Sequence, residues 1–123
     1  MSIILTNTTR SNTKLPFLEI KNDILGKDYQ LSVALVGETR ARSINKRSRN
    51  KTYAPNVLSF PLTRTAGELY LCPVVANKEA ASFEHSKRKH LMFLYIHGLL
   101  HLRGLDHGRK MESLEETYLK KYS

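Results

Sequence analysis

Three histidines lie close together near the C-terminus, in the stretch 97–107. His97 and His101 are four residues apart, so on a helix they project from one face about a turn apart and can bind the same metal ion. Gly104 tolerates left-handed backbone angles, so it can end the helix and turn the chain until His107 approaches the first pair. Three neutral imidazoles leave a fourth position on a divalent metal for water, as in catalytic zinc sites. The spacing therefore predicts a hydrolytic metal centre.

The same spacing of histidines and glycine occurs in the metzincin proteases, whose motif has a Glu directly after the first His. That Glu is the general base of peptide hydrolysis, and here its position is taken by Gly98. The ligand set is therefore kept while peptidase chemistry is disfavoured. Of the other histidines, His90 is expected either to hydrogen-bond a ligand or to face solvent, and His85 to lie on the surface.

Composition indicates one soluble domain spanning residues 1–123, with 41% hydrophobic and 25% charged residues. The longest apolar run, residues 91–96, is too short to cross a membrane, and the N-terminus shows no secretory signal. The single cysteine, Cys72, cannot form an internal disulfide and is expected to be a core residue. These features predict a cytoplasmic protein that does not contact membranes.

The net charge of +9 predicts a partner that is a polyanion, and nucleic acid is the commonest one in the cytoplasm. The positive residues concentrate in one basic cluster: Arg40, Arg42, Lys46, Arg47, Arg49 and Lys51. The alternative is that this cluster is simply the solvated face of a helix. A second cluster, residues 87–89, favours neither interpretation.

The elements that must position these residues follow from hydrophobic periodicity and from Pro and Gly positions. Strands are predicted over residues 3–6, 30–36, 56–61 and 68–72, the second being central and the last two forming a hairpin. Helices are predicted over residues 15–25, 38–50, 77–103 (with a possible break near Ser86) and 109–122. The 77–103 helix is apolar nearly all round in its second half, so it should be buried and hold its histidines rigidly.

Several motifs, in the same order along the chain, resemble the YbeY family of bacterial metal-dependent endoribonucleases, which act in rRNA maturation and ribosome quality control. They cover roughly residues 31–119 and comprise Ile44-Asn45, Arg49, Lys51, Asn56-Val57-Leu58-Ser59-Phe60-Pro61, Gly67-Glu68-Leu69 and the three-histidine stretch. The last of these is the most specific, and the Asn56 segment is an independent match.

The resemblance implies a small α/β (α+β) domain with a mixed sheet of about four strands, surrounding helices and a three-histidine site on the C-terminal buried helix and the following turn. It implies that His97, His101 and His107 bind one Zn²⁺ or another divalent transition metal, and that Arg49 is needed for activity. A guanidinium fork suits a phosphodiester and can stabilise charge developing on it. The metal could activate water or polarise the phosphate. The implied partners are single-stranded RNA and rRNA, together with the ribosomal small subunit, a ribosomal protein or an assembly GTPase.

Other candidates surround these residues. Arg47, Lys51 and Ser59 are candidates for RNA contact. Asp106 is expected either to hydrogen-bond a ligand imidazole or to fix the turn after Gly104. Glu115 is expected to be a surface carboxylate rather than a catalytic base.

Two alternatives to an rRNA endoribonuclease stay open. One is a non-catalytic ribosome-associated factor that binds rRNA and whose metal only holds the fold, and the other is a metallohydrolase with a different substrate. The open coordination position and Arg49 favour catalysis.

Overall fold

Four strands form a single mixed sheet in the computed structural model. The structure describes residues 2–123, so residue 1 of the predicted 1–123 domain lies outside the described part. The spatial order is β1-β2-β4-β3, with β1/β2 and β2/β4 parallel and β3/β4 antiparallel. The strands are β1 (Ile3–Asn7), β2 (Gln30–Leu35), β3 (Val57–Thr63) and β4 (Ala66–Leu71). The predicted four-stranded mixed sheet, the interior position of β2 and the β3–β4 hairpin are confirmed.

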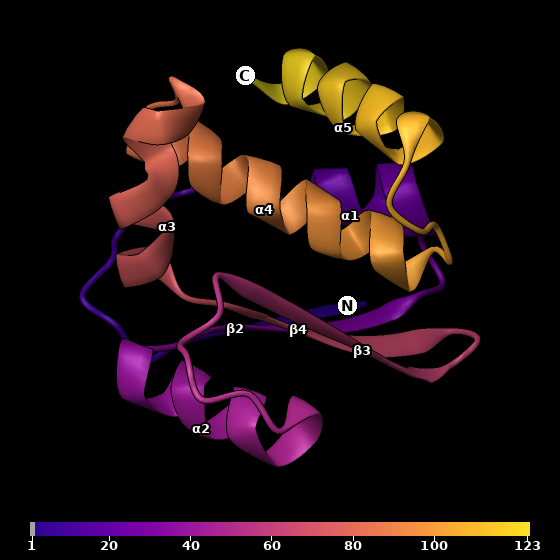
Figure 1. Cartoon of the computed structure of the whole chain (residues 1–123). Helices are drawn as coiled ribbons and strands as arrows, with labels where there is room; N and C mark the ends of the chain where they lie inside the picture. The colour runs from indigo at the N-terminus through magenta and orange to yellow at the C-terminus, as the bar shows by residue number, and fades with distance from the viewer. Residues whose placement is uncertain (1) are drawn as a thin grey trace.

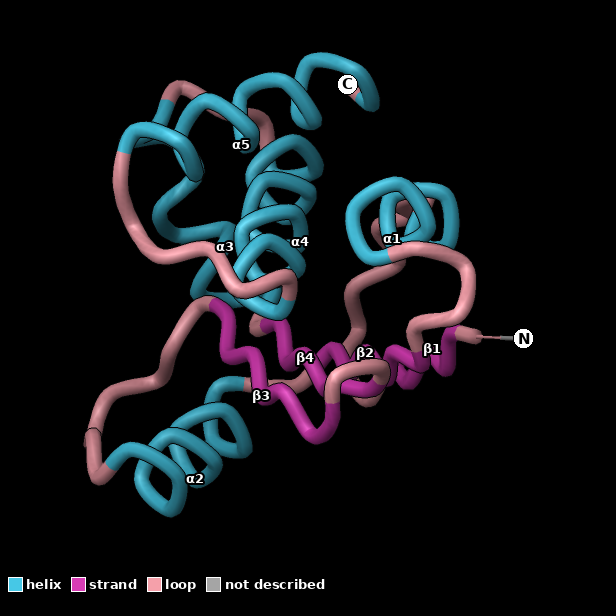
Figure 2. Tube along the Cα trace, turned by 90° about the vertical axis from the view of Figure 1, so that its right-hand side faces the viewer, coloured by secondary structure: helices cyan, strands magenta, loops and turns pink. Residues whose placement is uncertain are grey.

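Helices cover both faces of this sheet (Figure 1). They are α1 (Phe17–Leu25), α2 (Glu38–Arg49), α3 (Pro73–Glu79), the short 3₁₀ helix η1 (Ala80–Phe83), α4 (Lys87–Leu102) and α5 (Arg109–Tyr122). Figure 2 shows α2 alone on one side of the sheet, with α1, α3 and α4 on the other and α5 lying outside α4.

The main hydrophobic core lies between the sheet and the layer formed by α1 and α4. Alternate residues of β2, namely Leu31, Val33 and Leu35, point into it, as the two-residue period of a strand requires. The apolar residues of α4 meet them and continue on the far side of that helix toward Met111 of α5. Because α4 is covered from both sides, it is the helix that must be apolar nearly all round, as predicted.

The helix predicted over residues 77–103, with a break near Ser86, is divided in the structure into the end of α3, the 3₁₀ helix η1 and α4. Helix α3 begins at Pro73, a residue whose fixed φ suits the first turn of a helix. Helix α4 begins after Ser86, whose hydroxyl accepts a hydrogen bond from the backbone N–H of Lys89 at 3.1 Å. The break near Ser86 that the sequence suggested is therefore a true helix start.

None of the helices formed by residues 2–123 is both long enough and apolar enough to cross a bilayer.

Candidate metal centre

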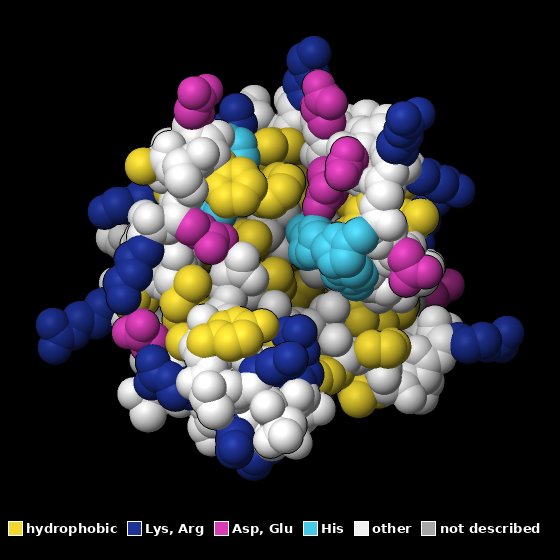
Figure 3. All heavy atoms as spheres, in the orientation of Figure 1, with side chains coloured by type: hydrophobic (Ala, Val, Ile, Leu, Met, Phe, Trp, Pro, Cys, Tyr) yellow, Lys and Arg dark blue, Asp and Glu magenta, His cyan; other side chains and the backbone are white. Residues whose placement is uncertain are grey.

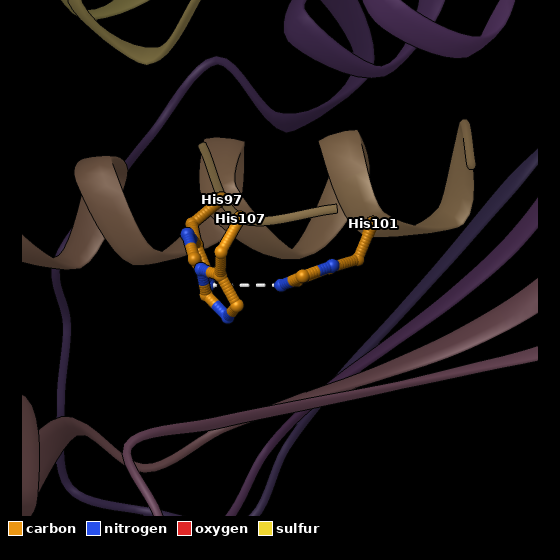
Figure 4. Close-up of side chains that lie close together, drawn as sticks. All are labelled: His97, His101 and His107. Carbon is orange, nitrogen blue, oxygen red and sulfur yellow. Dashed lines mark hydrogen bonds between the residues drawn. The ribbon is translucent and has the colours of Figure 1, made fainter. Parts of the chain in front are cut away.

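The three histidines come together at the C-terminal end of α4 (Figure 4). His97 and His101 project from the same face of that helix, and His107 returns from the loop between Gly104 and Gly108, whose φ angles are +102° and +154°. One ring nitrogen from each histidine can be chosen so that all three lie within 4.8 Å of one another. The glycines permit this loop because a side chain is strained at positive φ. The three residues therefore form a group that could bind a metal ion.

The hydrogen bonds of the imidazoles determine which nitrogen is free. The Nδ1 of His97 faces a carboxylate oxygen of Glu115, and the Nδ1 of His101 lies 3.1 Å from the carbonyl oxygen of Leu105. An ionised carboxylate and a carbonyl can only accept, so both Nδ1 atoms carry the proton and both Nε2 atoms present lone pairs. These Nε2 atoms face each other at 3.2 Å, which is repulsive unless a cation lies nearby. The donor set therefore fits a divalent metal.

The state of His101 also suits coordination. Burial, followed by the neighbouring His97, lowers the pKa of His101 below its ordinary value. A lower pKa keeps the imidazole neutral to more acidic pH, and only neutral imidazole binds metal.

Glu115 was expected on the surface, and that prediction is wrong, because it is only 7% exposed and its carboxylate accepts the hydrogen bond from His97. A carboxylate in this place fixes the tautomer and orientation of a metal-binding histidine. The sequence does carry a signal for its burial. Glu115 lies four residues after Met111 and four before Leu119, and both are buried, so all three share the inner face of α5.

Arg49 is brought to the histidines from the opposite side of the sheet. It is the last residue of α2, and Asn50 follows it in the left-handed conformation with φ of +56°. A cleft of about 330 Å³ lies between Arg49 and the histidines, and we call it the metal cleft. Its lining residues are Arg49, Asn56, Val57, Leu58, Ser59, Phe60, His97, Gly98, His101 and His107.

The structure thus brings together five predicted residues, namely the three histidines, Arg49 and Ser59. Arg47 and Lys51 are exposed residues on and just after α2 and do not line the cleft. In the space-filling view, Lys and Arg side chains lie directly below the histidine cluster, while Asp and Glu side chains lie above it (Figure 3). Basic side chains therefore border the histidines on the α2 side, and carboxylates lie next to them on the α5 side.

Gly98, which stands where the metzincin motif has its Glu, packs closely against the sheet. A Cβ at this position would lie 2.5 Å from Cδ1 of Leu69 on β4 and 3.2 Å from Cγ2 of Val57 on β3. The helix can rest this closely on the sheet only without a side chain here. A side chain at position 98 would have to displace Leu69, so packing as well as sequence disfavours a general base there.

Asp106 is exposed, and within residues 2–123 no hydrogen bond joins it to a histidine ring. The Nδ1 atoms of His97 and His101 are occupied by Glu115 and Leu105 instead. The latter partner could not be read from the sequence, because it is a backbone carbonyl placed by the turn.

The predictions for the other two histidines need correction. His90 is fully buried, and its Nε2 lies 2.8 Å from Oε1 of Glu79, so it neither faces solvent nor bonds a ligand histidine. His85 is half-buried rather than on the surface, with its Nδ1 3.0 Å from the Nδ1 of His90. Since the carboxylate makes His90 Nε2 the donor, His85 donates to His90.

Comparison with known proteins gives one consistent result. The family model of endoribonuclease YbeY matches residues 6–123. A curated endoribonuclease YbeY of Aromatoleum aromaticum is 38% identical, over 92% of this chain and 79% of its own length. The one of Pseudomonas syringae pv. tomato is 41% identical over 75% of this chain, which spans only 63% of that relative. A solution structure of a Thermotoga maritima protein superposes with a TM-score of 0.71 at 28% identity, covering 98% of this chain and 88% of that one.

Proposed function

Because this chain belongs to the YbeY family of endoribonucleases, we propose that it hydrolyses phosphodiester bonds of single-stranded RNA during rRNA maturation and ribosome quality control. The observation that carries the proposal is the shared cleft, in which Arg49 faces three histidines whose ligand atoms lie within 4.8 Å of one another. A guanidinium fork suits the phosphate oxygens, and a metal can polarise the phosphate or activate water, so the combination suits phosphodiester hydrolysis.

His97, His101 and His107 would hold the metal, and zinc suits three imidazoles in this arrangement. When bound, the metal supplies Lewis acidity and lowers the pKa of a coordinated water. Glu115 keeps His97 in the tautomer that presents Nε2 to the site. Arg49 binds the phosphate oxygens and stabilises the charge that develops on them during cleavage.

The surroundings favour a nucleic-acid strand that runs from the metal cleft over α2. Arg47 and Lys51 lie on this side, and Ser59 lines the cleft floor on β3. Basic side chains on one face attract RNA without reading its sequence. We infer that targeting to rRNA comes from the ribosomal small subunit, a ribosomal protein or an assembly GTPase in the cytoplasm.

The test is cleavage of an end-labelled single-stranded RNA by the metal-loaded protein, with chelator-treated protein and Arg49→Ala alongside. We expect both to lose cleavage, and Arg49→Ala to keep its bound metal, since Arg49 offers no ligand atom. Arg64→Ala, an exposed arginine on the β3–β4 turn that does not line the cleft, is the matched control and should cleave normally.

Full cleavage by Arg49→Ala would refute the role of Arg49. If the metal-loaded protein binds RNA but never cuts it, the chain is a binding factor whose metal holds the fold. Cleavage of another ester or amide in place of RNA would make it a metallohydrolase of a different substrate.

A further inference from the structure

A second cavity, which we call the side cavity, adjoins the metal cleft, and the function proposed above assigns no part of the RNA to it. Its volume is about 280 Å³, and it opens on the other side of His97. The metal cleft and the side cavity are both lined by Asn56, His97 and His107. An RNA whose phosphate lies at the histidines therefore has a neighbouring nucleotide within reach of the side cavity.

One wall of the side cavity is aromatic. The Phe83 ring is 51% exposed although it is a large apolar side chain. It is backed by the buried His90 ring, with 4.7 Å between centroids, and lies 6.0 Å from the ring of Phe93, which also lines the cavity. In Figure 3 apolar side chains lie on this face beside the histidine cluster. An exposed aromatic ring held firmly from behind is a stacking platform, because every nucleobase has a π-face.

Carboxylates, which are hydrogen-bond acceptors, make up half of the polar side chains that line the side cavity, and Asn56, His97 and His107 are the others. Three carboxylates line it, from Glu79, Glu112 and Glu115, and Glu115 is already engaged by His97. Glu79 is held in place because its Oε1 accepts from both His90 Nε2 and Asn56 Nδ2 at 2.8 Å. Its side chain is still 28% exposed, and no donor within residues 2–123 reaches its Oε2.

Carboxylates repel a phosphate and accept from N–H groups, so the side cavity suits a base rather than the RNA backbone. Adenine, cytosine and guanine each carry an exocyclic amine that donates, whereas the 4-position of uracil, like that of thymine, is a carbonyl oxygen that only accepts. Uracil has one donor on this edge, N3–H, where cytosine has an acceptor. A carboxylate opposite the 4-position therefore favours cytosine, although the two rings have the same size.

We propose that the side cavity binds the base next to the phosphate in the metal cleft, stacking it on Phe83 and selecting an amino-bearing base over uracil through Glu79. This assignment rests on the proposed function in taking single-stranded RNA as the ligand and the metal cleft as the site of its phosphate. It makes Phe83 and Glu79 binding residues, and it places the phosphate on the Arg49 side of His97 and the base on the Glu79 side.

The experiment measures binding of fluorescent oligo(C) and oligo(U), each about eight nucleotides long, by anisotropy. The protein is kept in chelator so that no strand is cut. We expect oligo(C) to bind more tightly than oligo(U). Phe83→Ala should weaken oligo(C) binding about 5-fold or more, the loss typical of a base–aromatic stack. Glu79→Gln should bring the two affinities close to equality. Leu62→Ala, which truncates an exposed side chain on β3 outside the metal cleft and the side cavity, should bind like the unaltered protein.

Equal affinity of the unaltered protein for the two strands, or unchanged binding by Phe83→Ala, would overturn the proposal. If circular dichroism shows that Glu79→Gln does not fold, the first comparison and Phe83→Ala still decide the outcome. The same strands are then given to metal-loaded protein. Cleavage without base preference would refute the side-cavity assignment alone, whereas base-dependent binding without cleavage would refute the nuclease alone.

Discussion

Replacing Glu115 tests whether a residue on α5 controls the metal centre on α4. The carboxylate is 7% exposed and accepts the Nδ1–H of His97. Glu115→Gln keeps an acceptor oxygen at this place but removes the charge, and Glu115→Ala removes both. Loss of a hydrogen-bond partner of this kind typically lowers metal affinity 10- to 100-fold. We therefore expect a loss of about tenfold for Gln and about 100-fold for Ala, or about 1.4 and 2.7 kcal/mol.

The assay is competition for Zn²⁺ between the protein and a chromophoric chelator near neutral pH. Glu116→Gln is the matched control, because it removes the same charge from the next position on α5, where the side chain is exposed. It should bind metal as the unaltered protein does, since a solvated charge is screened. Circular dichroism of each metal-free variant shows whether the helices are retained.

An affinity for Glu115→Gln equal to that of the unaltered protein would refute the reasoning, because the contact with His97 would then contribute nothing to coordination. An equal loss in Glu115→Gln and Glu116→Gln would mean that the net charge of α5 matters and the contact does not.

Two further predictions concern stability. In urea titration, Gly98→Ala should lower the free energy of unfolding by up to about 2 kcal/mol. Overpacking against the buried β4 costs about 1–3 kcal/mol, and the higher helix propensity of Ala returns about 1 kcal/mol. A variant more stable than the unaltered protein would contradict the close contact. Burial lowers the pKa of both His85 and His101 below the ordinary 6.5, so the unfolded chain takes up protons before the folded one does as the pH falls. The melting temperature of metal-free protein should therefore decrease from pH 7 to pH 5.5, and a flat or rising profile would contradict the directions of these pKa shifts.

The grouping of the three histidines could be predicted from the sequence because its geometry is local. A spacing of four residues on a helix and a glycine turn determine where His97, His101 and His107 lie. The apolar run of α4 and the hydrophobic alternation of β2 likewise indicated burial without any knowledge of their neighbours.

The errors arose where the outcome depends on which elements pack together. In the sequence, Glu115 is one charged residue in a helix with many polar positions. Its contact with His97, eighteen positions away, exists only because α5 packs on α4. His90 is buried because α3 and η1 return over the start of α4 with Glu79. The helix predicted to begin at Asn77 differs from the structure mainly at its start, because α3 begins earlier, at Pro73, and α4 starts anew after Ser86.

The closeness of the three ligands along the chain has a consequence for the denatured state. Residues 97–107 form a short segment, so an unfolded chain loses little loop entropy when it wraps the same three imidazoles around a metal. Metal bound to unfolded protein cancels part of the stabilisation that binding to the native state provides. Adding metal should thus raise the melting temperature by less than the native affinity alone implies, in contrast to a site whose ligands come from distant parts of the chain.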